Sequence, residues 1–367
     1  MRVLHVVATG QRRGAEVFAA DLVGAFGGDG IEHRVAVLRG PTLAVHFASP
    51  VAVLRNGGST LPALRVNLGT IGALRNLFGT WRPNVIQVHG GEPLKHVVLA
   101  NGVGSIPVVY RRIGLAPKRI TRGAGRIAHS HLMRRAARVV AVAEALRTET
   151  IETFGVPPHR VVTIPNAVDL ERLVPARPRQ DVRDALGIPS EAGVMISIGA
   201  LTWEKDPQAH LDVSSLVRER HPDAVHLFVG DGPLRPALES RIAGAGTAVR
   251  LLGSRDDVPD LLAAADVLLV ASRLEGLPGC VIEAGLLGRP TAGYALAGVP
   301  EVVDDGRSGL LVPPEDIVAL AEAVHRLLDD AALRESFGVA ARERCRERFD
   351  IRKIAPRYRR LYGELAG

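Results

Sequence analysis

Short apolar runs and amphipathic stretches alternate along the chain. The runs Val3–Ala8 and His33–Leu38 are typical of buried strands, and between them apolar residues recur at helical spacing from Val17 to Phe26. This alternation predicts a parallel α/β sheet with crossover helices. Further strands of the first half are expected at residues 85–88, 108–110, 139–143 and 161–164.

A second series of strands begins near residue 194. Val194–Ile198 and Val267–Val270 are apolar runs that precede loops and helical segments. More strands are expected at residues 225–229, 249–252, 291–294 and 309–312, and helices at residues 317–328 and 350–365. The second half therefore also has the pattern of an α/β domain.

The segment between the two series has the composition of a linker. Residues 165–189 hold four prolines and several charges. A chain of 367 residues suggests about two domains. We expect a first domain over residues 1–170, a linker over 171–192 and a second domain over 193–349. Open α/β sheets bind ligands beyond the carboxyl ends of their strands.

Composition narrows the class of protein. Hydrophobic residues make up 47% of the chain, yet no apolar run approaches the roughly 20 residues of a membrane span. The N-terminus is too soon interrupted by polar residues for a signal peptide, and two cysteines, Cys280 and Cys345, favour a reducing compartment. We expect a cytoplasmic protein. An aromatic content of 4% and the lack of a recognition motif disfavour a nucleic-acid binder.

Positive charge is concentrated in the first half. Residues 1–172 carry 22 Lys and Arg against 10 Asp and Glu, while the remainder is acidic. Between Lys118 and Val139 the chain is amphipathic and rich in arginine, including Arg119, Arg122, Arg126, Arg134, Arg135 and Arg138. This segment is either a solvated helix face or a peripheral contact with anionic lipid on the inner face of the cell membrane.

The strongest local motif follows the strand Val267–Val270. Glu275 is followed by a loop of Gly276, Leu277, Pro278 and Gly279, and a helix is expected to begin near Gly279. Amides at a helix start bind phosphate, aided by the helix dipole. Glu283 then lies about one turn inside the helix, where its carboxylate can accept hydrogen bonds from a vicinal diol. The alternative is a pair of solvated glutamates.

The longer pattern resembles the retaining glycosyltransferase family 4. The resembling pieces include Ile198-Gly-Ala-Leu-Thr-Trp-Glu-Lys205, Leu227-Phe-Val-Gly-Asp-Gly-Pro233, an E-x7-E signature from Glu275 to Glu283, Gly298-Val-Pro-Glu301 and, less tightly, Gly10 to Glu16, Val85 to His89 and Ile164 to Asp169. The resemblance implies the GT-B fold, in which two Rossmann-like α/β domains face each other across a cleft and the last helix, residues 350–367, packs on the first domain.

The resemblance also implies roles for single residues. Glu275 contacts the transferred sugar, Glu283 the nucleotide ribose, and Lys205 the phosphates, together with the loop from Gly276 to Gly279. Gly14, as part of the first domain's glycine loop, is expected to approach the donor. The implied donor is a nucleotide-diphosphate-sugar and no other cofactor is expected. No D-x-D sequence occurs, which fits a donor handled without a metal ion.

The chain departs from the family's pattern at two places. Ala200 stands where the family often has an arginine. Arg112 is the first candidate for the missing cation and Arg111 the second. The alternative is that these two arginines are an ordinary basic surface pair. The family's first domain also often has a histidine near the end of the strand equivalent to Val108–Tyr110, where this chain has Arg111 and Arg112. His89 ends another predicted strand and is either a ligand of acceptor or sugar or a structural histidine.

These features together predict a retaining, metal-independent glycosyltransferase. It would transfer sugar from a nucleotide-sugar to a hydroxyl of a glycan or lipid-linked acceptor, in cell-surface polysaccharide or glycolipid assembly. The alternative is a catalytically inactive GT-B protein that binds a nucleotide or glycan, and it is suggested by the arginine missing at Ala200 and by the missing histidine of the first domain.

Overall fold

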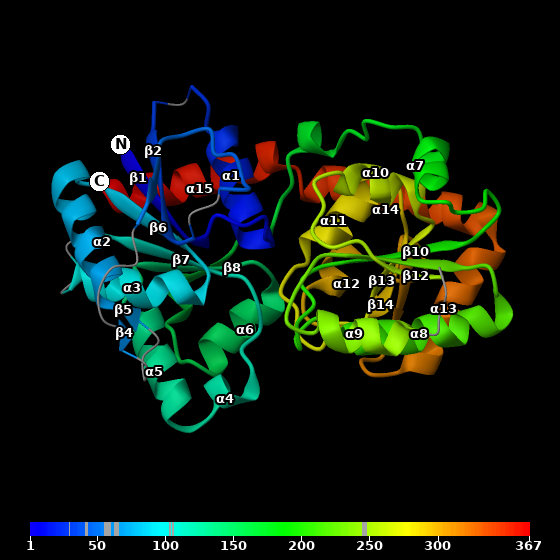
Figure 1. The fold of residues 1–367 in the computed structure, drawn as a ribbon. Helices are drawn as coiled ribbons and strands as arrows, with labels where there is room; N and C mark the ends of the chain where they lie inside the picture. The colour runs from blue at the N-terminus through cyan, green and yellow to red at the C-terminus, as the bar shows by residue number, and fades with distance from the viewer. Residues whose placement is uncertain are drawn as a thin grey trace. The chain divides into compact units, whose positions relative to one another are not determined.

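The computed structural model describes the chain except for residues 29, 41–42, 55–59, 62–65, 103, 105 and 244–247. The side chain of Arg119, part of the predicted basic segment, also lies outside the described part. The described residues form two compact units, residues 1–169 with 351–367, and residues 170–350 (Figure 1). Each unit is built around its own parallel sheet.

The first unit contains an open parallel sheet with the strand order β3-β2-β1-β6-β7-β8-β9. Every pairing in it is parallel, with β1 in register between β2 and β6. Its strands are β1 (Arg2–Thr9), β2 (Glu32–Arg39), β3 (Val51–Val53), β6 (Val85–His89), β7 (Val108–Arg112), β8 (Arg138–Ala141) and β9 (Val161–Thr163). Its helices are α1 (Gly14–Ala25), α2 (Leu68–Trp81), α3 (Gly91–Asn101), α4 (Lys118–Thr121), α5 (Gly123–Arg134), α6 (Glu144–Glu152) and α15 (Ile351–Ala366), with the short strands β4 (Thr60–Leu61) and β5 (Val66–Asn67) and the 3₁₀ turn η1 (Pro158–Arg160).

The last helix completes the core of the first unit. In α15, apolar residues recur every three or four positions, so one face of the helix is apolar. Ile354, Tyr358 and Tyr362 on this face are buried against Val3 of β1 and other core residues. The Tyr362 hydroxyl donates to Gln87 Oε1 of β6 at 3.0 Å, which gives the hydroxyl and the amide oxygen a partner inside the core.

The second unit contains a parallel sheet with the order β12-β11-β10-β13-β14-β15. The strands are β10 (Val194–Ile198), β11 (Val225–Val229), β12 (Val249–Leu251), β13 (Val267–Val270), β14 (Thr291–Tyr294) and β15 (Gly309–Val312). The helices are α7 (Arg179–Ala185), α8 (Pro207–Arg220), α9 (Arg235–Ile242), α10 (Val258–Ala264), α11 (Gly279–Leu286), α12 (Val299–Val302), α13 (Ile317–Asp329) and α14 (Ala331–Arg348), preceded by the 3₁₀ turn η2 (Leu170–Leu173).

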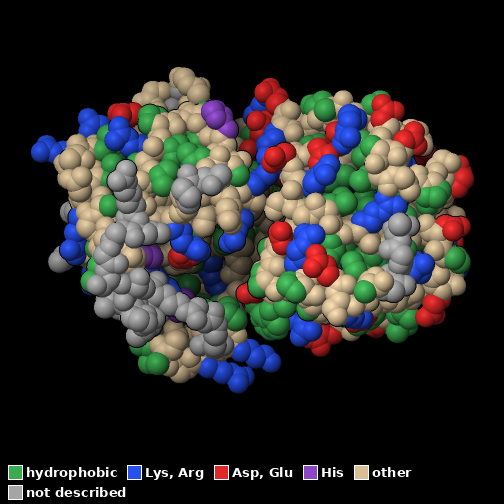
Figure 2. Space-filling view, in the orientation of Figure 1, with side chains coloured by type: hydrophobic (Ala, Val, Ile, Leu, Met, Phe, Trp, Pro, Cys, Tyr) green, Lys and Arg blue, Asp and Glu red, His purple; other side chains and the backbone are tan. Residues whose placement is uncertain are grey.

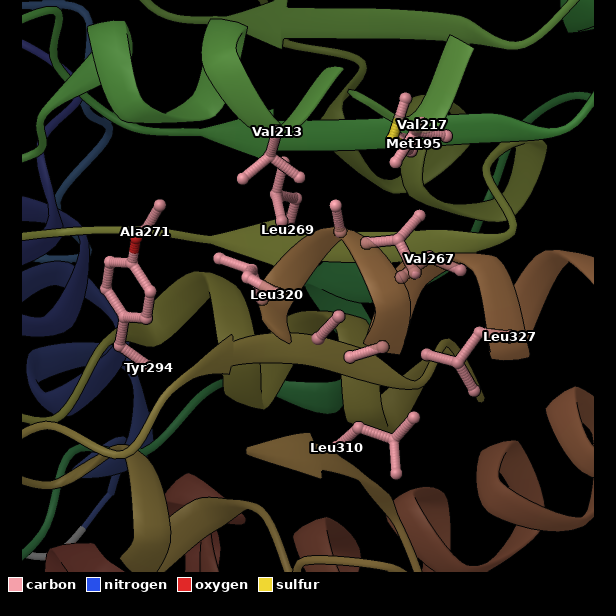
Figure 3. Packing of buried hydrophobic residues seen from close by; sticks show 14 of the residues in the cluster. Met195, Val213, Val217, Val267, Leu269, Ala271, Tyr294, Leu310, Leu320 and Leu327 are labelled. Carbon is pink, nitrogen blue, oxygen red and sulfur yellow. The ribbon is translucent and has the colours of Figure 1, made fainter. Parts of the chain in front are cut away.

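One face of this second sheet is covered by α8 and α13. Val213 and Val217 of α8 and Leu320 and Leu327 of α13 pack with Leu269 of β13 in one buried cluster (Figure 3). Strand residues in this core are largely apolar, as expected for a parallel sheet that helices cover. The core thereby fixes the strands whose carboxyl ends carry the candidate motif.

The segment expected to be a linker, residues 171–192, carries ordered structure of the second unit. It contains most of η2 and the whole of α7, and α7 packs on α10. Asp266 binds Arg179 and Arg183 at 2.7 and 2.8 Å and accepts a hydrogen bond from the Val194 amide at 2.8 Å. Prolines in this segment separate short elements that such ion pairs hold against the sheet.

The predicted fold class is confirmed, because two parallel α/β sheets of Rossmann-like order are present. The pattern analysis does not predict α2 or β3. Within the described residues, no helix combines the length and apolar character that crossing a membrane requires.

A row of three histidines lies inside the first unit. His5 Nδ1 is 3.3 Å from His89 Nε2, and His5 Nε2 is 3.0 Å from His33 Nδ1. Burial, followed by the neighbouring His33, lowers the pKa of His5 well below its usual value. Burial, followed by His5 and Arg111, does the same to the pKa of His89.

This row predicts loss of stability in mild acid. His5 and His89 stay neutral in the folded state, whereas in the unfolded chain they take up protons below about pH 6.5. The free energy of unfolding should therefore fall as pH falls below about 6.5, by up to about 1.4 kcal/mol per pH unit for each histidine. Urea unfolding at pH 7.5, 6.5 and 5.5, followed by the fluorescence of the buried Trp81 in a Trp203→Phe background, measures this dependence.

The matched variants are His5→Asn and His131→Gln. His5→Asn should make the pH dependence shallower, while His131→Gln changes an exposed histidine of α5 and should leave it unaltered. An equal pH dependence in wild type and His5→Asn would contradict the assignment.

Candidate functional site

Two loops that are far apart in sequence meet at the carboxyl edge of the second sheet. Strands β10 and β13 pair in parallel, with Met195 opposite Val267. The loops that follow them therefore leave the sheet side by side. A pocket lies there, lined by Ser197, Ile198, Gly199, Ala200, Leu201, Lys205, Pro207, His210, Phe228, Leu269, Val270, Ser272, Glu275 and Cys280.

Lys205 and Glu275 are brought into direct contact in this pocket. Lys205 Nζ lies 2.6 Å from Glu275 Oε1, and the Glu275 side chain is 6% exposed against 31% for Lys205. Burial is the largest single effect and would lower the pKa of Lys205, but Glu275, Cys280 and Glu204 together raise that pKa above its usual value. Lys205 is therefore a fixed cation with a specific carboxylate partner.

The two loops are also joined through their backbones. The amides of Arg273 and Leu274 donate to the Glu204 carbonyl at 2.9 and 3.1 Å. Arg273 Nε lies 2.5 Å from Asp206 Oδ2, so the residue after Lys205 is bound to the loop that carries Glu275. These contacts hold the lysine and the glutamate in one rigid arrangement.

Helix α11 begins within the motif, at Gly279, as expected. Pro278 precedes it in an extended conformation, and the Gly276 carbonyl accepts a hydrogen bond from the Gly298 amide at 2.8 Å. Leu277 is buried and anchors the loop. The helix start has the backbone geometry that suits an anion, since the first amides of a helix have no partner within it.

Glu283 lies one turn inside α11 and is paired with an arginine that sequence reasoning missed. Arg172 Nη2 is 3.0 Å from Glu283 Oε1, and the two side chains are 22% and 14% exposed. No local pattern identifies Arg172, because it lies within the predicted linker, 111 residues from its partner. Both glutamates of the signature are therefore matched with a cation.

Cys280 is unsuited to act as a nucleophile. Burial raises the pKa of its thiol to about 12, an effect that nearby Lys205 only partly offsets. A thiol with this pKa is protonated at neutral pH.

The candidates of the first unit lie in different surroundings. His89 is 1% exposed at the end of β6 and belongs to the histidine row. Arg112 is 2% exposed, binds Glu149, and donates to Thr150 Oγ1 at 2.6 Å, while its guanidinium lies 5.0 Å from the Phe154 ring centroid. These contacts favour structural roles for His89 and Arg112.

Arg111 and Gly14 also belong to the first unit. Arg111 is 1% exposed, binds Asn166, and lies 3.7 Å from the centroid of the Phe18 ring. Burial lowers the pKa of Arg111 to about 10. Gly14 begins α1, and a side chain at this position would meet open space. Lys205, Glu275, Glu283 and the Gly276–Gly279 loop all belong to the second unit. Of these, Lys205 and Glu275 line the pocket, and Ala200 adds no charge to it.

Two family models match consecutive parts of the chain. The model described as Glycosyltransferase Family 4 matches residues 12–172, and the model described as Glycosyl transferases group 1 matches residues 192–330. Together they span most of the chain, and the second contains the whole pocket described above.

Similar proteins include the alpha-D-kanosaminyltransferase of Streptomyces kanamyceticus, 26% identical over 86% of this chain and 90% of that protein. The 2-deoxystreptamine glucosyltransferase of the same organism is 30% identical over 63% of this chain, which spans 62% of that protein's length.

Among solved structures, Anabaena HepE in complex with UDP and glucose superposes with a TM-score of 0.86 at 22% identity, covering 99% of this chain and 100% of that one. This likeness concerns the fold. With the consecutive family matches and the motif of the second unit, it leads to one assignment: the chain belongs to glycosyltransferase family 4 and is a glycosyltransferase with the GT-B fold.

Proposed function

We propose that the protein transfers a sugar from a nucleoside diphosphate to a hydroxyl group, with retention of anomeric configuration and without a metal ion. The observation that carries the proposal is the Lys205–Glu275 pair, 2.6 Å apart, in a pocket beside the start of α11. A cation, helix-start amides and carboxylates at one sheet edge suit a ligand that combines a diphosphate with two polyol groups.

The donor binds along this edge of the second unit. Lys205 and the amides near Pro278 and Gly279 hold the diphosphate, whose negative charge grows as the bond to the sugar breaks. Glu275 accepts hydrogen bonds from the sugar hydroxyls, and Glu283 from the ribose. The complex of HepE with UDP-glucose supports a nucleotide-sugar as the ligand of this fold.

Transfer takes place on one face of the sugar. Glu275 is held by Lys205 and the Cys280 thiol is protonated, so neither supports a covalent glycosyl intermediate. The acceptor oxygen bonds to the anomeric carbon as the bond to the leaving phosphate oxygen breaks. That phosphate oxygen takes the acceptor's proton, and the products are the nucleoside diphosphate and the glycoside.

The acceptor is a polyhydroxylated glycan or lipid-linked glycan of cell-surface assembly. An Escherichia coli relative, 31% identical over half of this chain, is named for a diphosphoundecaprenol-linked acceptor. Relatives named for 2-deoxystreptamine favour a small aminocyclitol as the second class. An acceptor screen with both classes distinguishes them, and turnover of any acceptor excludes the inactive nucleotide-binding alternative.

The first unit contacts the inner face of the cell membrane through α4 and α5. Figure 2 shows Lys and Arg side chains on the surface over α4. Ile127 of α5 is 69% exposed beside the exposed Arg126. Apolar and basic groups on one short helix suit anionic lipid headgroups.

Lys205→Gln should weaken the binding of the donor and of its nucleoside diphosphate. A hydrogen bond to a charged group contributes about 1.5–3 kcal/mol, so we expect a loss of about ten- to a hundredfold in affinity. Trp203 is 53% exposed and two residues from Lys205, so its fluorescence in a Trp81→Phe background reports the titration. Lys118→Gln, an exposed lysine of α4, is the control and should bind normally; equal affinities for both variants would remove Lys205 from the site.

The two signature glutamates should separate binding from turnover. Glu275→Ala should leave nucleoside diphosphate affinity within about threefold while lowering kcat at least about a hundredfold, because it contacts the sugar. Glu283→Ala should instead weaken nucleotide binding. Isothermal titration with steady-state kinetics measures both, and unchanged affinity and activity in the two variants would contradict the assignment.

Retention and metal independence are tested on one reaction. With the donor found active among UDP-, GDP- and ADP-sugars, the product should keep the donor's anomeric configuration by proton NMR, and the rate should persist in EDTA. Inversion of the product would refute the same-face reaction, and loss of activity restored by Mg²⁺ would refute metal independence.

A further inference from the structure

Arg172 and Glu283 form a second, partly buried ion pair beside the donor pocket. Arg172 Nη2 lies 3.0 Å from Glu283 Oε1, and both side chains are mostly withdrawn from water. Attraction between such charges is stronger than between exposed ones, and removal of one partner leaves the other uncompensated. The pairing is therefore a constraint on where the Glu283 carboxylate points.

The backbone that carries Arg172 is anchored to the second unit. Leu173 is 4% exposed, and three residues further on the Ala176 amide donates to Asp260 Oδ1 at 2.6 Å. Arg177 Nε lies 2.8 Å from Asp260 Oδ2, and its Nη2 is 2.7 Å from Asp257 Oδ2. Arg172 thus lies on a segment that is anchored to α10, so its guanidinium can hold the Glu283 carboxylate in a defined position.

The Glu283 side chain is long, so its carboxylate has a defined position only if another group holds it. A glutamate has several rotamers, and fixing one of them costs conformational entropy. A guanidinium that holds one carboxylate oxygen restricts these rotamers before any ligand arrives. It also balances the negative charge of Glu283, which would otherwise repel a diphosphate bound at the start of the same helix.

We propose that Arg172 is a positioning residue for nucleotide recognition and sets the preference for ribose over deoxyribose. It holds the Glu283 carboxylate in the orientation that accepts hydrogen bonds from the 2′- and 3′-hydroxyls. The inference rests on the proposed function, because it assumes that Glu283 binds the ribose. Lys205, by contrast, binds the diphosphate, so it contributes equally to the affinity for ribonucleotides and deoxyribonucleotides.

The test compares each nucleoside diphosphate with its 2′-deoxy form. UDP, GDP and ADP are first titrated into the full-length wild type by calorimetry. The one that binds most tightly and its 2′-deoxy counterpart are then titrated into wild type, Arg172→Gln, Arg172→Lys, Lys205→Gln and Arg220→Gln. Arg220 is the matched control. It lies at the end of α8 that is away from Lys205 and forms an exposed ion pair with Asp329.

In wild type we expect the ribonucleotide to bind at least about fivefold more tightly than the deoxynucleotide, since a carboxylate loses a partner. Arg172→Gln should reduce this ratio to below about twofold, and Arg172→Lys should restore part of it. Lys205→Gln should weaken both ligands and keep the ratio. Arg220→Gln should change neither affinity nor ratio.

A wild-type ratio in a folded Arg172→Gln variant would overturn the proposal, as would a wild type that binds both ligands equally. If Arg172→Gln does not fold, Arg172→Met replaces it with the same expected loss. If wild type binds none of the three nucleoside diphosphates, the proposed function itself fails and this role with it. If Arg172→Gln binds the nucleoside diphosphate but keeps the wild-type ratio of ribonucleotide to deoxynucleotide affinity, only the role of Arg172 is contradicted.

Discussion

The parallel pairing of β10 with β13 is the constraint on which the candidate site depends. These strands are neighbours in the sheet although their sequences are separated by β11, β12 and the helices between them. Because parallel strands end at the same edge, the loops after them must meet, and Lys205 comes within 2.6 Å of Glu275. The buried cluster under α8 and α13 packs against these strands and includes Leu269, which also lines the pocket, so the core helps to set the pocket's geometry.

The pocket combines opposite charges in a way that suits a ligand with two kinds of polar group. Lys205 neutralises Glu275, and Arg172 neutralises Glu283, so neither carboxylate repels an incoming diphosphate. A ligand with phosphates and hydroxyls offers new partners to both members of each pair. In the proposed donor complex, this exchange of polar contacts would offset the desolvation cost that a buried charge otherwise carries.

The parts of the site that could be predicted from sequence are those whose determinants are local. The strand, the glycine loop and the start of α11 follow one another directly, so Glu275 and Glu283 could be placed on them. The burial of each candidate side chain and its ion-pair or hydrogen-bond partner could not be predicted, because both depend on residues far away in the sequence. His89 ends a strand but contacts His5, and Arg112 binds Glu149. Arg172, which binds Glu283, lies in a segment whose prolines indicated only a linker.

The position of α15 has a consequence for how the chain is made. The first unit is discontinuous, since its core includes Ile354, Tyr358 and Tyr362 from the last residues of the chain. The second unit is continuous from Leu170 to Asp350. During synthesis, domains generally fold as their residues leave the ribosome. Here the core of the first unit is incomplete until α15, which follows the second unit in the sequence, has been made, so the second unit is the first that can fold completely. Without α15, an apolar face of the first sheet would be open to aggregation.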